Sequence, residues 1–344
     1  MQIEENKPLT TYNTFGIAVT ARYFTEVHTV DDFKILMQTD VYRNHKRLIL
    51  GGGSNILFTG NYDGLVIKSS IKGISIVSET ETEVIVKANA GEVWHSFVQW
   101  CIANNYAGIE NLSLIPGQVG AAPMQNIGAY GVEIKDVFYQ LEALDINTGE
   151  ALRFNLNDCA FGYRESVFKN TLKDTCFITA VLFRLTKLSS PKAIYQFKTD
   201  YGDIKYTLGE MQAYTLSIKA VSDAVCKIRS SKLPDPKELG NAGSFFKNPS
   251  VPQSKYEELV MQYPVMPSYP QKDGTVKIPA GWLIEQCGWK GKVVGNTGSH
   301  KSQALVLVNY GQATGSEIWN LAQEIKKSVA DKFGIDINPE VNVV

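Results

Sequence analysis

The stretch that most constrains this chain is the glycine-rich run at residues 115–131, which reads IPGQVGAAPMQNIGAYG. It contains four glycines, an adjacent pair of alanines and no charged side chain, and it follows neither the helix period nor the strand period. Because glycine permits positive φ and leaves its amide uncovered, successive N–H groups in such a run can surround a phosphate or pyrophosphate. A tight buried connection, in which small residues serve packing, is the alternative.

A further glycine-rich run lies at residues 48–58, LILGGGSNILF, where an apolar strand breaks into three glycines, a serine and an asparagine. It predicts a second anion-binding turn. Neither run is a GxGxxG fingerprint that opens a helix, and the chain has no phosphate loop ending in Gly-Lys-Ser/Thr. These absences argue against a Rossmann fold and against a nucleoside triphosphatase.

Composition narrows the class of protein. The chain has 344 residues, 44% hydrophobic, which predicts two or three domains with ample cores. A net charge of −1 offers no electrostatic reason to bind nucleic acid or an anionic membrane. Five scattered cysteines without a CxxC pair predict reduced thiols and no metal site, and the polar N-terminus is unlike a signal peptide. We therefore expect a cytoplasmic protein without membrane insertion.

Hydrophobic periodicity predicts alternating strands and helices along the chain. Strands are expected at residues 19–26, 47–50, 83–89, 137–146, 151–156, 177–185, 304–309 and 337–344, and helices at residues 30–38, 91–104, 215–232, 256–263, 280–287 and 315–334. The tyrosine-rich segment 195–206 is expected to be a loop, and residues 240–249 a turn of small residues. His95 has no partner at metal-ligand spacing, so we expect a structural or surface histidine.

Three polar residues stand out from their surroundings. Arg164 lies in FGYRESVFK, where its alternatives are a surface arginine and a cation that grips a carboxylate at both oxygens. Ser244 lies in GNAGSFFKNP without a nucleophile-elbow context, which leaves a hydrogen-bonding or proton-donating role. Glu340 interrupts the apolar pattern of the closing strand, a position where a carboxylate is ordinarily exposed to solvent.

The motifs GGGSN and IPGxVGAAPxQNIGAYG resemble the flavin-binding domain of UDP-N-acetylenolpyruvoylglucosamine reductases, which make UDP-N-acetylmuramate for bacterial cell walls. The resemblance runs in order from Thr14 to the last residues. It implies an α+β fold: a vanillyl-alcohol-oxidase-type (PCMH-like) FAD-binding fold of two subdomains, residues 1–70 and 71–225, and then a smaller α+β substrate-binding domain, residues 226–335. The closing strand 336–344 is expected to return to the first subdomain.

The resemblance also implies roles for particular residues. It assigns catalysis to Arg164, Ser244 and Glu340, the serine being the proton donor. Non-covalent FAD would be held by Gly51, Gly52, Gly53, Ser54, Asn55, Ile115, Pro116, Gly117, Gly120, Ala121, Gln125, Asn126, Gly128 and Ala129. Substrate would be bound by Tyr201, Lys232, Asn248 and Gln303, and Tyr201 in a YGD sequence is similar to the substrate-covering tyrosine of the longer subclass of these enzymes. Gln118 and residues 293–300 follow the family pattern only loosely.

The implied reaction is NADPH-dependent reduction of UDP-N-acetylglucosamine enolpyruvate to UDP-N-acetylmuramate by a monomer. Two alternatives differ in class. An FAD-dependent oxidase or dehydrogenase of a small hydroxylated molecule would often carry a histidine for covalent flavin attachment, and neither glycine-rich run contains one. A nucleotide-binding module without catalysis would leave Arg164, Ser244 and Glu340 as unrelated surface residues.

Overall fold

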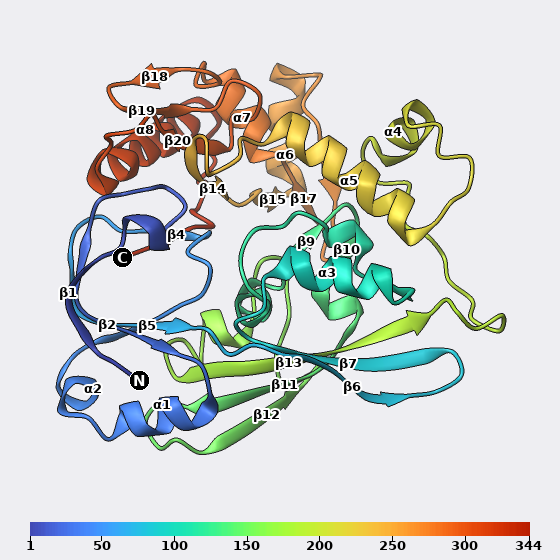
Figure 1. The fold of residues 1–344 in the computed structure, drawn as a ribbon. Helices are drawn as coiled ribbons and strands as arrows, with labels where there is room; N and C mark the ends of the chain where they lie inside the picture. The colour runs from blue at the N-terminus through green and yellow to red at the C-terminus, as the bar shows by residue number, and fades with distance from the viewer. The chain divides into compact units, whose positions relative to one another are not determined.

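The computed structural model describes residues 1–344, and the chain divides into two compact units that are each built from separate stretches. Unit 1 contains residues 1–7, 21–52 and 63–231. Unit 2 contains residues 8–20, 53–62 and 232–344. Figure 1 shows the course of the chain from the N-terminus in blue to the C-terminus in red.

Unit 1 begins with a four-stranded sheet in the order β1-β2-β5-β3. Its strands are β1 (Glu4–Pro8), β2 (Thr20–Val27), β5 (Tyr62–Ser69) and β3 (Arg47–Leu50), with helices α1 (Val30–Met37) and α2 (Asp40–Asn44) between β2 and β3. Helix α1 starts at a capping box, in which the Thr29 side chain accepts from Asp32 N–H and the Asp32 carboxylate accepts from Thr29 N–H. Phe33 of α1 stacks on Phe177 with ring centroids 4.3 Å apart, which joins this sheet to the second sheet of the unit.

The second sheet of unit 1 is antiparallel and has the order β12-β11-β13-β7-β6, with β8 also paired to β13. Its strands are β12 (Ala151–Asn155), β11 (Phe138–Asp145), β13 (Cys176–Lys187), β7 (Glu83–Asn89), β6 (Ile74–Glu79) and β8 (Tyr106–Ala107). Helix α3 (Trp94–Ala103) covers β7 and β13 (Figure 1) and buries Trp94 and Phe97 against Phe183. Burial of these large rings supplies much of the unit's hydrophobic stabilisation.

The remaining elements of unit 1 are short, apart from α5. They are η2 (Glu110–Leu112), η3 (Val119–Gln125), β9 (Gly128–Ala129), β10 (Val132–Glu133), η4 (Ile134–Asp136), η5 (Val167–Lys169), α4 (Ile204–Glu210) and α5 (Ile218–Lys232). Helices α4 and α5 share a small core that includes Ile204, Val221 and Val225.

Unit 2 contains η1 (Thr10–Tyr12) and three small sheets. The largest has the order β14-β20-β19-β18, formed by β14 (Gly240–Ser244), β20 (Val306–Asn309), β19 (Thr297–Ser299) and β18 (Val293–Val294). A second sheet contains β15 (Ser250–Pro252), β17 (Thr275–Lys277) and β16 (Tyr269–Pro270), and in a third β21 (Asn342–Val343) pairs in parallel with β4 (Ile56–Leu57). The helices are α6 (Gln253–Gln262), α7 (Ala280–Gln286) and α8 (Gly315–Phe333).

The helices and most strands expected from periodicity are present, with four differences. The glycine-rich run at residues 115–131 contains the 3-10 helix η3, because small residues with one proline tolerate the tight i to i+3 turn. Ser244 ends strand β14 rather than lying in a turn, although Gly243 has φ +69° and the register shifts there. Helix α4 begins inside the expected tyrosine loop. The closing strand is short, since only Asn342 and Val343 are in a ladder.

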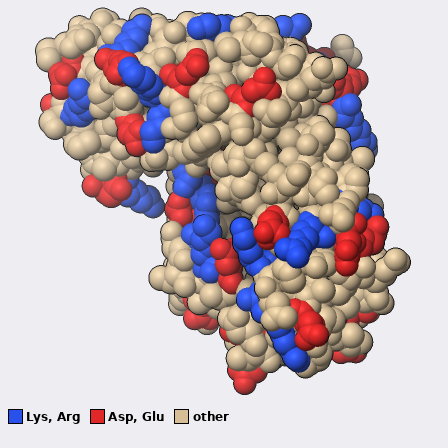
Figure 2. All heavy atoms as spheres, turned by 90° about the vertical axis from the view of Figure 1, so that its left-hand side faces the viewer, with Lys and Arg blue, Asp and Glu red and all other residues tan.

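None of the helices combines the length and the apolar sequence that crossing a lipid bilayer requires. On the face drawn in Figure 2, acidic and basic side chains are interspersed. Such a mixture agrees with the net charge of −1 and gives that face no single-sign field to attract a polyanion.

Candidate functional site

Within unit 1, Gly51 and Gly52 of the glycine-rich run at residues 48–58 lie against the run at residues 115–131. A β-carbon built on Gly52 would lie 2.9 Å from Gly117 Cα, and one built on Gly51 would lie 3.5 Å from both Ala121 Cβ and the Gln118 Oε1. A separation below 3.0 Å from main chain leaves no room for a side chain. Glycine at position 52 is therefore required by the close approach of two main chains, as the sequence pattern suggested.

The first glycine-rich run (residues 48–58) presents unused main-chain donors. The N–H groups of Gly52, Gly53 and Ser54 donate no hydrogen bond within the chain, while Gly52 is exposed and Ser54 half-buried. Lys68 lies nearby and donates from Nζ to Gln118 Oε1 at 3.2 Å. Burial lowers the pKa of this lysine, whereas Glu26 acts in the opposite direction. Within unit 1, the unused Gly52 N–H and the adjacent Lys68 cation fit the pyrophosphate of a dinucleotide such as FAD.

Residues 161–169, called here the arginine hairpin, are tied to the second glycine-rich run (residues 115–131). Asn126 is buried in the left-handed conformation, and its Nδ2 donates to Gly162 O at 3.0 Å. Ser166 Oγ donates to Met124 O at 2.6 Å. Asn126 Nδ2 also donates to Glu133 at 3.0 Å, and its Oδ1 accepts from Lys135 N–H at 3.1 Å. The Asn126 amide thus supports the scaffold around the hairpin on three sides.

Arg164 occupies the turn of the arginine hairpin. Its φ of +56° is uncommon for a residue with a β-carbon, and an antiparallel bridge between Gly162 and Glu165 closes the turn around it. Its Nη2 donates to Gly128 O at 2.6 Å, and its guanidinium lies 5.3 Å from the centre of the Tyr163 ring. Two predicted residues, Arg164 and Gly128, are thereby in direct contact.

Arg229 is a second arginine near Arg164, and the sequence did not single it out for function. It lies on α5, and its Nε donates to Leu114 O at 3.3 Å. Burial lowers the pKa of Arg229 most; Tyr130 raises it, and the neighbouring charge of Arg164 lowers it. Two cations that interact electrostatically are typical of a region that receives an anionic ligand. The only sequence signal was a basic residue near the end of an amphipathic helix.

Tyr201 lies beside the end of the second glycine-rich run. Its ring meets Tyr130 edge-on with centroids 6.4 Å apart, and a β-carbon on Gly131 would lie 3.4 Å from Tyr201 Cβ. The side chain is 57% exposed. A phenol held on one edge and open to solvent elsewhere can donate a hydrogen bond to a bound ligand.

Unit 2 brings together Ser244 and Glu340. The main-chain N–H of Glu340 donates to the carbonyl of Phe245 at 2.7 Å, and a bridge pairs Phe246 with Pro339. Asn55 joins them, because its Nδ2 donates to Glu340 O at 3.3 Å. Ser244 and Glu340 are both half-buried. The main chain next to Ser244, the main chain of Glu340 and the Asn55 side chain are thus neighbours in unit 2.

The other predicted substrate residues of unit 2 are Lys232, Asn248 and Gln303. Asn248 uses its Oδ1 to accept from Ala280 N–H at 2.9 Å, at the start of α7. Gln303 Oε1 accepts from Leu305 N–H at 3.4 Å, and Lys232 is exposed where α5 ends. The predicted catalytic and substrate-binding residues are therefore divided between the units. Arg164 and Tyr201 belong to unit 1, and the others belong to unit 2.

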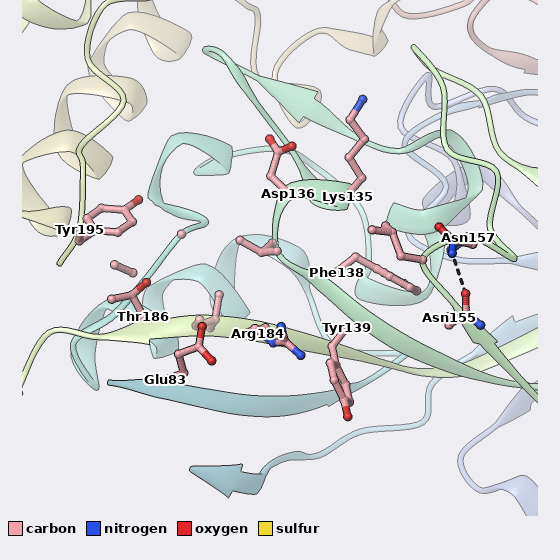
Figure 3. Close-up of a pocket in the computed structure, with 15 residues that line it drawn as sticks. Glu83, Lys135, Asp136, Phe138, Tyr139, Asn155, Asn157, Arg184, Thr186 and Tyr195 are labelled. Carbon is pink, nitrogen blue, oxygen red and sulfur yellow. Dashed lines mark hydrogen bonds between the residues drawn. The ribbon is translucent and has the colours of Figure 1, made fainter. Parts of the chain in front are cut away.

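A cavity of about 680 Å³ in unit 1 contains none of the predicted site residues. Figure 3 shows Tyr195 at one side of it, Asn155 and Asn157 at the other, and Arg184 and Tyr139 between them. The Arg184 guanidinium lies 5.2 Å from the centre of the Tyr139 ring. This cavity is lined by sheet strands rather than by the glycine-rich runs, so it is not the candidate site.

Comparison with known proteins agrees with this geometry. A family model described as FAD binding domain matches residues 21–155, and one described as UDP-N-acetylenolpyruvoylglucosamine reductase, C-terminal domain, matches residues 235–344. A solved structure of UDP-N-acetylenolpyruvylglucosamine reductase from Thermus caldophilus has a TM-score of 0.67 and 22% identity, covering 100% of this chain and 99% of that chain. These two findings confirm the expected α+β FAD-binding fold with a smaller domain after it.

Relatives of higher identity cover the whole chain. The UDP-N-acetylenolpyruvoylglucosamine reductase of Flavobacterium johnsoniae is 51% identical over 344 residues, and that of Amoebophilus asiaticus is 50% identical over 344 residues, each covering 100% of both chains. The enzyme of the same description from Pseudomonas savastanoi pv. phaseolicola is 49% identical over 343 residues, which cover 100% of this chain and 99% of the relative. Identity at this level over the full length means that the chain belongs to the UDP-N-acetylenolpyruvoylglucosamine reductase family.

Proposed function

We propose that this protein reduces UDP-N-acetylglucosamine enolpyruvate to UDP-N-acetylmuramate with NADPH and bound FAD, a step in making peptidoglycan precursors. The observation that carries the proposal is the hydrogen bond from Arg164 Nη2 to Gly128 O, which fixes a permanent cation on the second glycine-rich run. Full-length relatives with the name of this reductase support it. The substrate carries a carboxylate, and arginine is the side chain best suited to bind one.

FAD would be held without a covalent bond by the two glycine-rich runs. Main-chain donors at Gly52, Gly53 and Ser54 are available for its pyrophosphate, and we propose that the other predicted contacts, from Gly51 to Asn55 and from Ile115 to Ala129, surround the rest. When bound, FAD supplies hydride chemistry that no amino-acid side chain has, accepting hydride from NADPH and passing it to the vinyl group of the substrate.

Arg164 and Glu340 are proposed to bind the substrate carboxylate. Addition of hydride at the terminal vinyl carbon builds negative charge on the carbon next to that carboxylate, and the charge spreads onto its oxygens. The Arg164 guanidinium would offset it, with its orientation already fixed by Gly128. Glu340, when protonated, would donate a hydrogen bond to the same oxygens.

Ser244 is proposed to protonate the carbon next to the carboxylate. A serine hydroxyl is a weak acid, but a carbanion of this kind is a much stronger base, so transfer is favourable if the alkoxide is promptly reprotonated. Ser244 lies at the irregular end of β14, where the adjacent Phe245 carbonyl accepts from Glu340 N–H. This arrangement keeps the hydroxyl and the carboxylate on neighbouring main chains.

The remaining assignments follow from the resemblance. Tyr201, Lys232, Asn248 and Gln303 would contact the UDP part of the substrate, with Tyr201 covering its phosphates as in the longer subclass. We propose that residues 1–70 with 336–344, residues 71–225 and residues 226–335 form the two FAD-binding subdomains and the substrate-binding domain. The pairing of β21 with β4 supports the return of the closing strand. We further propose a cytoplasmic monomer.

Absorbance of the purified protein and an anaerobic titration test the reaction class. We expect one flavin per chain, bleaching of its visible band by NADPH, and recovery of the band when the enolpyruvyl UDP-sugar is added without oxygen. Acid precipitation should release all the flavin, because the binding is non-covalent. Reduction of the flavin by a hydroxylated small molecule, with no reoxidation by the enolpyruvyl sugar, would favour the oxidase alternative. A colourless protein would contradict both.

A further inference from the structure

Residues 193–201, called here the tyrosine segment, are extended but belong to no sheet. Burial alternates along them, since Ala193, Tyr195 and Phe197 are half-buried whereas Ile194 and Gln196 are exposed. From Ile194 to Gly202, no main-chain N–H donates to another main-chain carbonyl. A half-buried strand normally has ladder hydrogen bonds to fix its position. Here, side chains of neighbouring elements must do so.

Glu110 of η2 provides the first attachment. Only 1% of it is exposed, and its Oε1 accepts from the Tyr195 hydroxyl at 2.5 Å while its Oε2 accepts from Gly108 N–H at 2.9 Å. No lysine or arginine pairs with this carboxylate, so these two donors are what compensates its burial. Burial and the nearby Glu110 raise the pKa of Tyr195, which keeps the hydroxyl protonated and able to donate.

Asn111, the next residue, provides the second attachment. Its Nδ2 donates to Lys198 O at 2.7 Å and to Tyr130 O at 3.0 Å, so one amide group joins the tyrosine segment to the second glycine-rich run. The side-chain carbonyl of Asn111 is buried and has no partner. A buried polar atom without a partner is normally avoided. Because the carbonyl of the Asn111 side chain gains no hydrogen bond, the two bonds donated by its Nδ2 are the reason for an asparagine at this position.

Both attachments act on the residues just before Tyr201. Lys198 is three positions away, and the Tyr201 ring then contacts Tyr130, whose carbonyl is held by the same Asn111 amide. Tyr195 meets Phe197 edge-on with centroids 5.2 Å apart, which stiffens the span between the attachments. Tyr195 also forms one side of the cavity in Figure 3.

We propose that Glu110, Asn111 and Tyr195 are positioning residues, which hold the tyrosine segment so that the Tyr201 hydroxyl is presented beside the second glycine-rich run. They contact neither cofactor nor substrate themselves. Their effect on substrate binding is transmitted through Tyr201, and this part of the inference rests on the proposed function. The attachment itself is a property of the folded chain and can be measured without substrate.

The test compares four variants of the FAD-loaded enzyme. Tyr195→Phe removes only the hydroxyl, and Asn111→Asp keeps the shape of the side chain but removes both donors. Glu110→Gln keeps a hydrogen-bonding partner for Tyr195. Tyr206→Phe removes an exposed hydroxyl and is the control. Thermal melting of each variant first shows that it is folded. Limited trypsin digestion without substrate, read by mass spectrometry as cleavage after the exposed Lys198 whose carbonyl Asn111 holds, then reports on the segment. Steady-state kinetics report KM for the UDP-sugar.

We expect faster cleavage after Lys198 in Tyr195→Phe and Asn111→Asp, with Glu110→Gln and Tyr206→Phe close to wild type. KM for the UDP-sugar should rise about tenfold in Tyr195→Phe, the size expected when one hydrogen bond to a charged group is lost. The rate of flavin reduction by NADPH should not change. In a Tyr201→Phe background, Tyr195→Phe should raise KM no further, because the group that it positions is already missing.

Unchanged cleavage after Lys198 in both Tyr195→Phe and Asn111→Asp would overturn the attachment. A KM effect of Tyr195→Phe that persists in full in the Tyr201→Phe background would overturn positioning through Tyr201. If Tyr201→Phe alone leaves KM unchanged, the proposed substrate contact of Tyr201 is what fails, and the digestion measurement still decides the attachment.

Discussion

The guanidinium of Arg164 and the carbonyl oxygen of Gly128 are joined by a hydrogen bond of 2.6 Å. Arg164 lies in the turn of the arginine hairpin with a φ of +56°. The conformation of this turn sets the direction in which its side chain leaves the main chain. Asn126 and Ser166 hold the same hairpin to the same glycine-rich run. A catalytic cation with a fixed orientation loses little entropy when it binds a planar carboxylate.

Replacing Arg164 with lysine tests the planar fork. Lysine keeps the charge but cannot donate to Gly128 O and to both oxygens of a carboxylate from one rigid group. We expect kcat for the UDP-sugar to fall about 10- to 100-fold, as loss of one or two charged hydrogen bonds predicts. Flavin reduction by NADPH should stay near the wild-type rate. Equal loss in both half-reactions would point to a damaged fold instead of a lost substrate contact.

Replacing Ser244 with alanine separates the two half-reactions. Flavin reduction by NADPH should be nearly normal, whereas reoxidation of pre-reduced flavin by the enolpyruvyl sugar should slow by about 10² to 10⁴-fold, the usual effect of losing a general acid. Cysteine at this position should restore part of the rate, since a thiol is a stronger acid. Rapid mixing with absorbance detection gives both rates. Reoxidation of the alanine variant at the wild-type rate would exclude Ser244 as the proton donor.

Replacing Gly52 with alanine tests the contact between the glycine-rich runs. The new β-carbon would lie 2.9 Å from Gly117 Cα, so one main chain must move. We expect a substoichiometric flavin content and a weaker FAD affinity, measured by absorbance and by titration of the apoprotein. Gly60→Ala is the matched control, because a β-carbon there meets nothing within 4 Å. If both variants bind flavin like the wild type, the close approach is not needed for the cofactor.

His95 predicts a dependence of stability on pH. Burial, and then the charge of Arg229, lower its pKa, and its Nδ1 accepts from Leu114 N–H at 2.9 Å, which requires the neutral ring. The neutral His95 ring therefore makes its full contribution to the free energy of unfolding above the pKa of histidine in the unfolded chain, about 6.5. That contribution is lost as pH falls towards the lower pKa of His95 in the folded protein. Denaturant unfolding at several pH values should show His95→Gln with a weaker fall below about pH 6.5 than wild type. Replacement of the exposed His28 should leave the profile unchanged, and equal profiles for all three proteins would contradict the prediction.

Main-chain features of the site could be predicted from the sequence, whereas side-chain partners could not. Glycines at 51, 52 and 117 indicate close approach because glycine alone lacks a β-carbon, and the structure has that approach. That the two glycine-rich runs contact each other could not be predicted, because some sixty residues separate them and no local sequence pattern indicates a contact across that separation. The roles of Arg164, Ser244 and Glu340 came from resemblance to a family and stay proposals.

Buried polar residues were the main omission. Glu110 and Asn111 stand in the apolar stretch AGIENLSL, and a carboxylate with such neighbours is a signal for a buried hydrogen-bonded site. Its partner, Tyr195, is 85 positions away, which no periodicity connects. Asn126 was predicted to contact FAD, and its side chain makes scaffold hydrogen bonds on three sides. Helix α4 was missed because tyrosines and charges hide its short apolar face.

The way in which the two units share the chain bears on its synthesis. The chain passes between them after residues 7, 20, 52, 62 and 231. In unit 2, the carbonyl of Phe15 accepts from the Asn309 amide at 2.8 Å, and Thr59 N–H donates to Val344 O at 2.7 Å. The first segments of unit 2 therefore cannot pair with their partners until nearly all of the chain has been made, whereas all residues of unit 1 have been made at residue 231. Unit 1 is therefore expected to fold earlier during translation than unit 2.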